Sequence, residues 1–180
     1  MPLTKQTSES KTEKLVATGC LATGSGGGII ITSPLGSCVA VIAYDKTSIT
    51  GGIAHIMLPG NSPTESNAEE NKYAENAITN LLDELDKLGI NNAKIEIYLV
   101  GGANVLRREN DTIADKLIFS IFEIIERKAL SIKRTSLGGN ERRTAQLILH
   151  SGSVILKVGD KREQELFNFI SGKTGYLNHE

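Results

Sequence analysis

The feature that most constrains the fold is a series of short apolar segments, rich in β-branched residues, that begins near residue 15. The segments span residues 15–18, 28–32, 38–44 and 52–57. Glycine and small polar residues separate them, notably at 25–28 and 45–47, as expected for turns between strands. The short connection from residue 44 to residue 51 favours an antiparallel hairpin, because strands adjacent in sequence usually pair in space. The sequence therefore predicts a β-sheet core.

Two later segments show the period of an amphipathic helix instead. Between residues 73 and 88, apolar side chains recur at steps of three and four positions. Gly89 follows this segment, where a glycine commonly ends a helix in the left-handed conformation. A second helix is predicted over residues 112–128, and Thr112 with Asp115 resembles the start of a capping box.

The remaining strands are predicted around and after the second helix. They span residues 94–100, 131–135, 144–150 and 153–158. This order of strands and helices predicts one α/β domain, with a mostly antiparallel sheet and the two main helices on one side.

The domain is expected to cover residues 14–158. Residues 1–13 are polar and show no apolar periodicity, so they are interpreted as a disordered leader. Residues 159–180 are interpreted as a C-terminal tail in which a few apolar residues form a short packed helix.

Composition excludes several classes of protein. The 180 residues suffice for one ordinary domain with its own core. The 20 basic and 21 acidic residues create no positive field to hold a nucleic acid. No apolar run approaches the roughly 20 residues that cross a membrane, and the run before Cys20 is too short for a secretion signal. We expect a cytoplasmic protein without direct membrane insertion and without nucleic acid as a partner.

The two cysteines, Cys20 and Cys38, are too few for a disulfide scaffold, so reduced thiols are expected. Neither they nor the three histidines show the close spacing of zinc ligands, and no metal is expected. Cys20 has no histidine in a comparable motif and is interpreted as a structural or exposed thiol.

Cys38 and His55 are the strongest candidates for chemistry. A free thiol has a pKa of about 8.5, so a neighbouring imidazole is needed to favour the thiolate and to shuttle its proton. Gly36 would let a substrate backbone approach the thiol, and amide N–H groups near Ser37 and Cys38 could stabilise an oxyanion. The residues alone leave an alternative open, in which both side chains are inert parts of the core.

The surrounding motifs are similar to those of the CheD family, the chemoreceptor glutamine deamidases of bacterial and archaeal chemotaxis. The resemblance rests on LGSCVAV at residues 35–41, on GIAHIMLP at residues 52–59, and on the spacing of 17 positions between Cys38 and His55. Weaker matches follow, KYA, GGA and GGN at residues 72–74, 101–103 and 138–140, and then Arg143. Together the motifs cover roughly residues 14–158.

The resemblance implies roles for three residues: Cys38 as the nucleophile, His55 as the general base, and Thr32 as the third catalytic position. A hydroxyl at Thr32 would orient the imidazole or the substrate. The implied reaction is attack of the Cys38 thiolate on the side-chain amide of a protein glutamine, release of ammonia, and hydrolysis of the thioester to glutamate. No cofactor is implied.

The resemblance also implies partners and a fold. The substrate would be the cytoplasmic domain of methyl-accepting chemotaxis proteins, whose new glutamates become methylation sites. A second implied partner is the phosphatase CheC, which binds the deamidase and reduces its activity. The implied fold is a three-layer α/β/β sandwich.

Three departures from the family pattern bear on activity. Pro34 precedes the LGSC motif and restricts Ser33 to extended conformations. Residues 113–117 differ from the glycine, arginine and asparagine that the family usually carries there, and Arg142 stands in place of a glycine. An alternative function is therefore a divergent, weakly active CheD that acts mainly as a binding regulator of a CheC-like phosphatase. Transglutamination would share the thioester, but nothing in the sequence marks an amine site.

Overall fold

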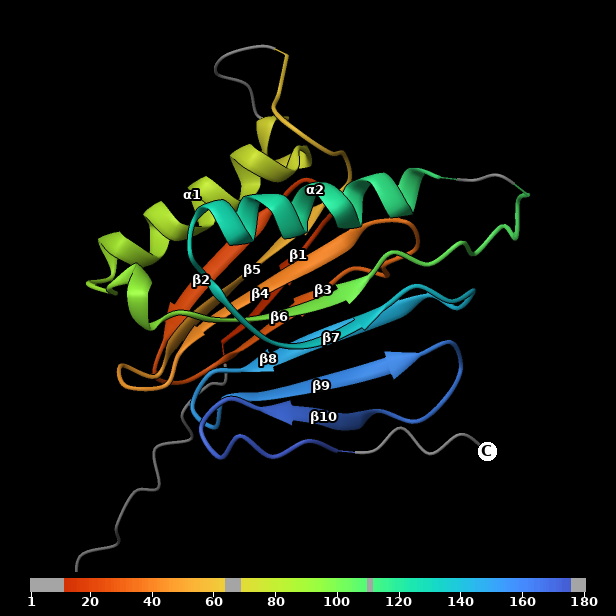
Figure 1. The fold of residues 1–180 in the computed structure, drawn as a ribbon. Helices are drawn as coiled ribbons and strands as arrows, with labels where there is room; N and C mark the ends of the chain where they lie inside the picture. The colour runs from red at the N-terminus through yellow and green to blue at the C-terminus, as the bar shows by residue number, and fades with distance from the viewer. Residues whose placement is uncertain (1–11, 64–68, 110–111, 176–180) are drawn as a thin grey trace, which may run out of the picture.

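A computed structural model of the chain describes residues 12–63, 69–109 and 112–175. These residues form ten β-strands and two α-helices, which are arranged in three layers (Figure 1). A central sheet has the strand order β2-β5-β4-β6-β7, and an outer sheet has the order β1-β3-β8-β9-β10. Both helices cover the face of the central sheet that points away from the outer sheet. The predicted single-domain α/β/β sandwich is confirmed.

The central sheet consists of β2 (Leu21–Ser25), β4 (Val39–Asp45), β5 (Thr50–Ile56), β6 (Glu96–Gly101) and β7 (Ser131–Leu137). The outer sheet consists of β1 (Glu13–Val16), β3 (Ile29–Thr32), β8 (Arg143–Ile148), β9 (Ser153–Val158) and β10 (Gln164–Asn168). The helices are α1 (Ala74–Lys87) and α2 (Ile113–Arg127), with 3-10 turns at Glu70–Lys72 and Asn92–Lys94. Each sheet has one parallel pair, β1 with β3 and β6 with β7, and its other neighbouring strands are antiparallel.

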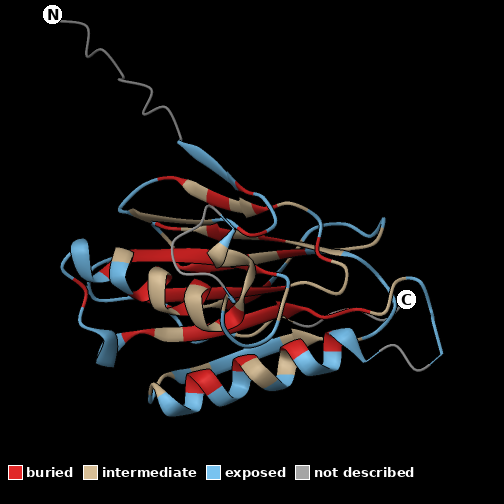
Figure 2. Ribbon diagram, turned by 90° about the horizontal axis from the view of Figure 1, so that it is seen from above, coloured by how far each residue is buried: buried red, intermediate tan, exposed pale blue. Residues whose placement is uncertain are grey.

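Two apolar cores separate the three layers. Val41 of β4 belongs to the core under the helices, together with Leu81 of α1 and Ile121 of α2. The next residue of β4, Ile42, belongs to the core between the sheets, together with Leu147 of β8. Side chains of a strand alternate between its two faces, so β4 is buried on both of them. Its continuous apolar run follows from this central position, which Figure 2 shows as unbroken burial along the central strands.

Strands β4 and β5 form the hairpin that the sequence predicted, with Asp45 paired to Thr50 at its turn. The carboxylate of Asp45 accepts hydrogen bonds of 2.9 Å from the Thr47 N–H and from the Ser48 hydroxyl. An aspartate that binds the backbone two residues ahead is a common way to close a turn. This turn sets the register of the two strands that carry the candidate site.

The helices confirm the predicted apolar periods. Helix α1 buries Ala74, Ala77, Ile78, Leu81, Leu82 and Leu85, and α2 buries Ala114, Leu117, Ile121, Ile124 and Ile125. Gly89 has a φ of 84° and follows α1 in the left-handed conformation, as predicted. Thr112 occupies the N-cap position of α2 but makes no side-chain capping hydrogen bond, so the predicted capping box is not formed.

The interpretation of the tail is corrected by β10, which is a strand and not a short helix. It extends the outer sheet beside β9, and Phe167 and Phe169 are buried in the core between the sheets. A register shift between Glu165 and Phe167 interrupts the strand, so its apolar residues do not alternate regularly. The domain therefore continues beyond residue 158.

Two further differences concern the N-terminal part. Strand β2 was not predicted, because its sequence LATGS is short and contains a glycine. Glu13, which the sequence placed in the leader, belongs to β1, and residues 1–11 of the predicted leader lie outside the described part of the chain.

Candidate active site

Cys38 and His55 lie on the same face of the central sheet. His55 pairs with Ala40 of β4, and Cys38 precedes Ala40 by two positions, so all three side chains share one face. That face points to the outer sheet, because Ala40 and Cys38 belong to the core between the sheets. The register makes Cys38 and His55 diagonal neighbours. Side chains in this relation are close enough to interact.

Backbone hydrogen bonds hold the loop before Cys38 from two sides. Leu35 donates to the carbonyl of Arg143 at 2.7 Å, and Arg143 donates to the carbonyl of Leu35 at 3.0 Å. On the other side, the Gly102 N–H donates to the carbonyl of Cys38 at 2.8 Å. The thiol is therefore carried by a backbone that is tied to both sheets.

Gly101 allows this close contact. It has a φ of 122°, and a Cβ atom built on it would lie 2.2 Å from the carbonyl oxygen of Cys38. A side chain at this position is excluded both by the left-handed backbone and by the contact. The close approach of the two backbones at Gly101 lies directly against the nucleophile candidate.

The imidazole of His55 is fully buried and surrounded by oxygen atoms. Its Nδ1 lies 3.2 Å from the Ser33 hydroxyl and 3.4 Å from the Val16 carbonyl oxygen. Its Nε2 lies 3.5 Å from the Thr18 hydroxyl. The ring is thus oriented by residues from the ends of β1 and β3 in the outer sheet.

Thr32 is the last residue of β3, and only 1% of it is exposed. Its hydroxyl accepts a hydrogen bond of 3.0 Å from the Ala145 N–H of β8. The structure therefore brings Thr32 into the region between the sheets, where Cys38 and His55 also lie. The hydroxyl groups in contact with the imidazole belong instead to Ser33 and Thr18, and a catalytic role for Thr32 stays a prediction.

Burial favours the neutral forms of both candidate groups. It raises the pKa of the Cys38 thiol above its ordinary value, and a hydrogen bond from the backbone of Cys38 itself acts weakly in the opposite direction. Burial lowers the pKa of the His55 imidazole, and the Val16 carbonyl partly offsets this effect. Both pKa shifts thus run toward the uncharged form, a thiol at Cys38 and a neutral imidazole at His55.

A pocket of about 200 Å³ lies beside the loop that carries Cys38. Its lining residues are Gly36, Ser37, Ala103, Asn104, Val105, Leu106 and Arg142. Cys38 is not among them, but it directly follows Ser37 and is half-buried. The pocket thus borders the two residues that precede Cys38 in the loop.

Ser33 and Thr18 are the site residues that the sequence did not reveal. Ser33 carried one usable signal, since Pro34 restricts it to extended conformations next to Thr32. Thr18 carried none, because its contact with His55 depends on how β1 and β2 are placed. Cys20 is an exposed free thiol, and its carbonyl accepts a hydrogen bond of 3.0 Å from the His55 N–H.

Among the residues described, no group of three or more histidine, cysteine, aspartate or glutamate side chains could hold a metal ion. None of the helices within the described ranges is long and apolar enough to span a membrane.

The fold and this site define a class: a single-domain α/β/β sandwich with a thiol and an imidazole at the seam between its two sheets. Residues 57–158 match the family model described as CheD chemotactic sensory transduction. This match covers more than half of the chain and begins two residues after His55. The chain belongs to the CheD family.

Curated relatives extend the similarity to most of the chain. A protein of Chlorobium luteolum named probable chemoreceptor glutamine deamidase CheD is 38% identical over 162 residues, which cover 89% of this chain and 81% of the relative. A protein of the same name from Methanococcus maripaludis is 41% identical over 133 residues, covering 72% and 84% of the two chains. The chemoreceptor glutamine deamidase CheD of Thermotoga maritima is 28% identical over 155 residues, covering 86% and 98%.

Proposed function

We propose that this protein deamidates glutamine side chains of methyl-accepting chemoreceptors, with Cys38 as the nucleophile and His55 as the general base. The proposal is carried by one observation. In a chain of the CheD family, whose curated relatives are named chemoreceptor glutamine deamidases, Cys38 and His55 share one face of a buried hairpin beside a pocket.

The first half of the reaction forms a thioester. His55 takes the proton of the Cys38 thiol, and the sulfur attacks the side-chain amide carbon of the glutamine. The resulting imidazolium then donates that proton to the amide nitrogen, and ammonia leaves as the C–N bond breaks. The burial of both groups matches this sequence, because a neutral imidazole is the form that can accept a proton.

The second half returns the enzyme to its resting state. Neutral His55 takes a proton from a water molecule, whose oxygen attacks the thioester carbon. The C–S bond breaks, the thiolate recovers a proton, and the product is a glutamate side chain. Neither half requires a metal or an organic cofactor.

The loop before Cys38 offers donors for the oxyanion that forms in both halves. No acceptor in the described ranges takes the backbone N–H of Ser37, which also lines the pocket. The N–H of Cys38 is the next donor along the loop. A glutamine side chain that enters from the pocket would place its carbonyl oxygen near these two groups, where developing charge is stabilised.

Mass spectrometry of a cognate receptor cytoplasmic fragment tests the proposal. Wild-type protein should convert specific glutamines to glutamate, and Cys38→Ala should lower the rate by about 1,000-fold or more. Cys20→Ala is the matched control and should retain the wild-type rate, because Cys20 lies on the far side of His55 from Cys38. No conversion by wild type, or full activity of Cys38→Ala, would contradict the proposal.

A second candidate function is binding of a CheC-like phosphatase by a weakly active CheD protein. It is favoured by burial, which raises the pKa of Cys38 and lowers that of His55, because both shifts reduce the share of thiolate at neutral pH. Co-purification with such a phosphatase, together with no deamidation of receptor fragments at any pH, would support this candidate. Deamidation by the free protein that Cys38→Ala abolishes would contradict it.

A further inference from the structure

The oxygen atoms around the His55 ring fix which nitrogen carries the proton. Nδ1 lies near both the Ser33 hydroxyl and the Val16 carbonyl, and Nε2 lies near the Thr18 hydroxyl. A carbonyl oxygen can only accept, whereas a hydroxyl can donate or accept. A lone pair on Nδ1 would point at the lone pairs of the carbonyl. The neutral ring therefore carries its proton on Nδ1 and its lone pair on Nε2.

With the proton on Nδ1, only Nε2 keeps a lone pair, so in the proposed reaction Nε2 is the nitrogen that takes the thiol proton. When it does so, the ring becomes an imidazolium, and its Nδ1–H needs an acceptor. The Ser33 hydroxyl is the nearer of the two candidates, at 3.2 Å against 3.4 Å for the Val16 carbonyl. That carbonyl already accepts the Ser33 N–H at 2.9 Å. The hydroxyl is therefore the better acceptor for the charged ring.

The backbone holds Ser33 in place for this contact. Thr32 on one side is bound to β8 through the Ala145 N–H, and the Ser33 N–H is bound to Val16. Pro34 on the other side restricts Ser33 to extended conformations. In the sequence, Pro34 stood out as a departure from the family pattern that bears on activity. In the structure it limits the freedom of the residue whose hydroxyl contacts the imidazole.

We propose that Ser33 is a positioning residue for the deamidation reaction, whose hydroxyl accepts the His55 Nδ1–H and stabilises the imidazolium formed when Nε2 takes the Cys38 proton. This inference rests on the proposed function and adds to it a residue that acts through His55. The hydroxyl would do in this protein what a carboxylate does in a Ser-His-Asp triad.

The charged groups around the His55 ring decide whether a change at Ser33 could act on the ring through another residue. In the described part of the chain, no charged side chain contacts the imidazole. The titratable side chains next to β5 at this level are Cys20 before β2 and Cys38 before β4. Lys14 shares the inward face of β1 with Val16, but its Nζ donates to the Thr23 carbonyl of β2 at 2.7 Å and not to the imidazole. A change at Ser33 therefore acts on the ring directly.

The test uses Ser33→Ala and Ser33→Thr in a Cys20→Ala background, which leaves Cys38 as the single thiol. The alkylation rate of Cys38 by iodoacetamide is measured from neutral to high pH, alongside kcat and KM for a receptor fragment. Ser33→Ala should lower the neutral-pH rate and kcat about 10-fold, because a hydrogen bond to a charged group is lost. The high-pH rate, where the thiol ionises without help, and KM should stay unchanged. Ser33→Thr keeps the hydroxyl and should restore the neutral-pH rate.

Nitrogen NMR of the wild-type ring gives a second readout that does not depend on any variant folding. It should show the proton on Nδ1 in the neutral state. A proton on Nε2, an unchanged alkylation profile in Ser33→Ala, or equal losses at neutral and high pH in both variants would overturn the inference. If wild type fails to deamidate receptors while Ser33→Ala still changes the alkylation profile as expected, the proposed function fails and the positioning role of Ser33 stands.

Discussion

The two ends of strands β4 and β6 differ in the kind of contact that holds them, which is made by backbone atoms at one end and by side chains at the other. At the end that carries the candidate site, Val39 pairs with Gly101, and the contact with Cys38 is made by backbone atoms. At the opposite end, Tyr44 pairs with Glu96, and large side chains make the contacts. We refer to these as the site end and the closed end.

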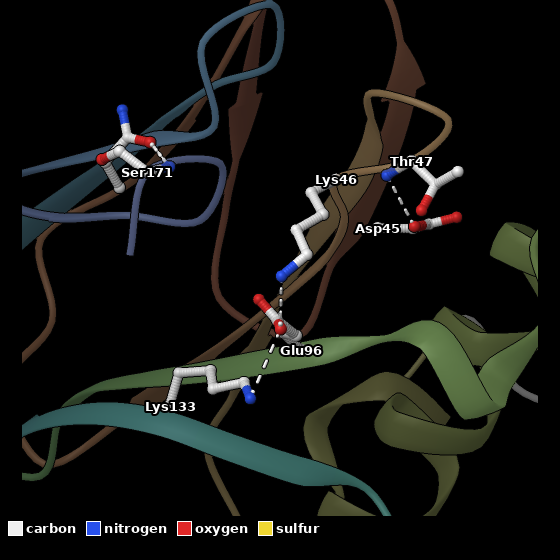
Figure 3. Close-up of polar contacts among 7 residues, drawn as sticks. Asp45, Lys46, Thr47, Glu96, Lys133 and Ser171 are labelled. Carbon is white, nitrogen blue, oxygen red and sulfur yellow. Dashed lines mark hydrogen bonds and ion pairs between the residues drawn. The ribbon is translucent and has the colours of Figure 1, made fainter. Parts of the chain in front are cut away.

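The closed end is held by stacking, hydrogen bonding and charge. The rings of Tyr44 and Phe169 stack with centroids 5.2 Å apart, and the Tyr44 hydroxyl donates to the Leu149 carbonyl at 2.6 Å. Glu96 lies between Lys46 and Lys133, each with its Nζ atom 3.3 Å from Oε1 (Figure 3). The two contacts of Tyr44 join the central sheet to the outer sheet, whereas the ion pairs of Glu96 lie within the central sheet. None of these contacts involves the thiol.

The comparison indicates that stability and reactivity reside in different parts of the same strands. Backbone contacts at the site end leave little room for substitution, but they also leave Cys38 half-buried beside a pocket. Changes at the closed end should therefore lower stability without altering the thiol. Changes at the site end should alter both.

The largest expected effect is that of Gly101→Val. The new side chain would meet the Cys38 carbonyl in a left-handed backbone, so the free energy of unfolding should fall by about 4 kcal/mol or more, and deamidation should be lost. Urea denaturation measures the first quantity. Gly60→Val is the matched control, with a φ of 70° but no atom within 4 Å of the added Cβ, and should cost much less. Equal losses in the two variants would show that the contact with Cys38 is unimportant.

The second prediction concerns the pH dependence of the site end. Because burial raises the pKa of Cys38, less thiolate is present at neutral pH than for an ordinary cysteine. Iodoacetamide should therefore alkylate Cys38 about 10-fold more slowly than the exposed Cys20 at neutral pH. The rate should keep rising above the pKa of about 8.5 of an ordinary thiol. The two rates are measured in the single-cysteine variants Cys20→Ala and Cys38→Ala. A plateau for Cys38 below neutral pH would show a resting ion pair with His55 instead.

Tyr44→Phe should lower the stability of the closed end without changing the thiol at the site end. It removes the hydroxyl and leaves the Leu149 carbonyl buried without that donor, so the free energy of unfolding should fall by about 1 to 2 kcal/mol. The alkylation profile of Cys38 should match that of wild type in the folded protein. A changed profile would mean that the closed end controls the thiol after all.

The smallest effect is expected for Glu96→Gln. Glu96 is partly buried and pairs with two lysines that are largely exposed, so the cost should be about 1 kcal/mol or less. Because ionic strength screens exposed pairs, the difference from wild type in thermal denaturation should shrink as salt is added. A difference that salt leaves unchanged would indicate packing and not charge.

The sequence predicted those parts of the fold where a residue pattern is compatible with only one local structure. The apolar run of β4 required burial on both faces, the periods of α1 and α2 required an amphipathic helix, and Gly89 ended α1 as expected. Strand β10 escaped prediction because its bulge breaks the alternation of apolar residues. Strand β2 escaped because its residues are small and owe their conformation to pairing with β5.

The candidate site, like the fold, could be predicted from the sequence only in part. Cys38 and His55 stood out by their motifs and spacing, and the hairpin register then placed them on one face, though diagonally. The contact of Ser33 with His55 was beyond the sequence, because it joins the end of β3 in one sheet to β5 in the other. Such contacts depend on the distance between layers, which no local pattern encodes.

The central claim is that Cys38 forms a thioester with the target glutamine, and hydroxylamine trapping tests it most directly. A thioester is attacked by hydroxylamine in place of water, so wild-type protein incubated with a receptor fragment should leave a hydroxamate on the glutamines that are otherwise deamidated. Cys38→Ala should leave none, and Cys20→Ala should match wild type. Deamidation that proceeds in wild type with no hydroxamate at any hydroxylamine concentration would contradict the claim.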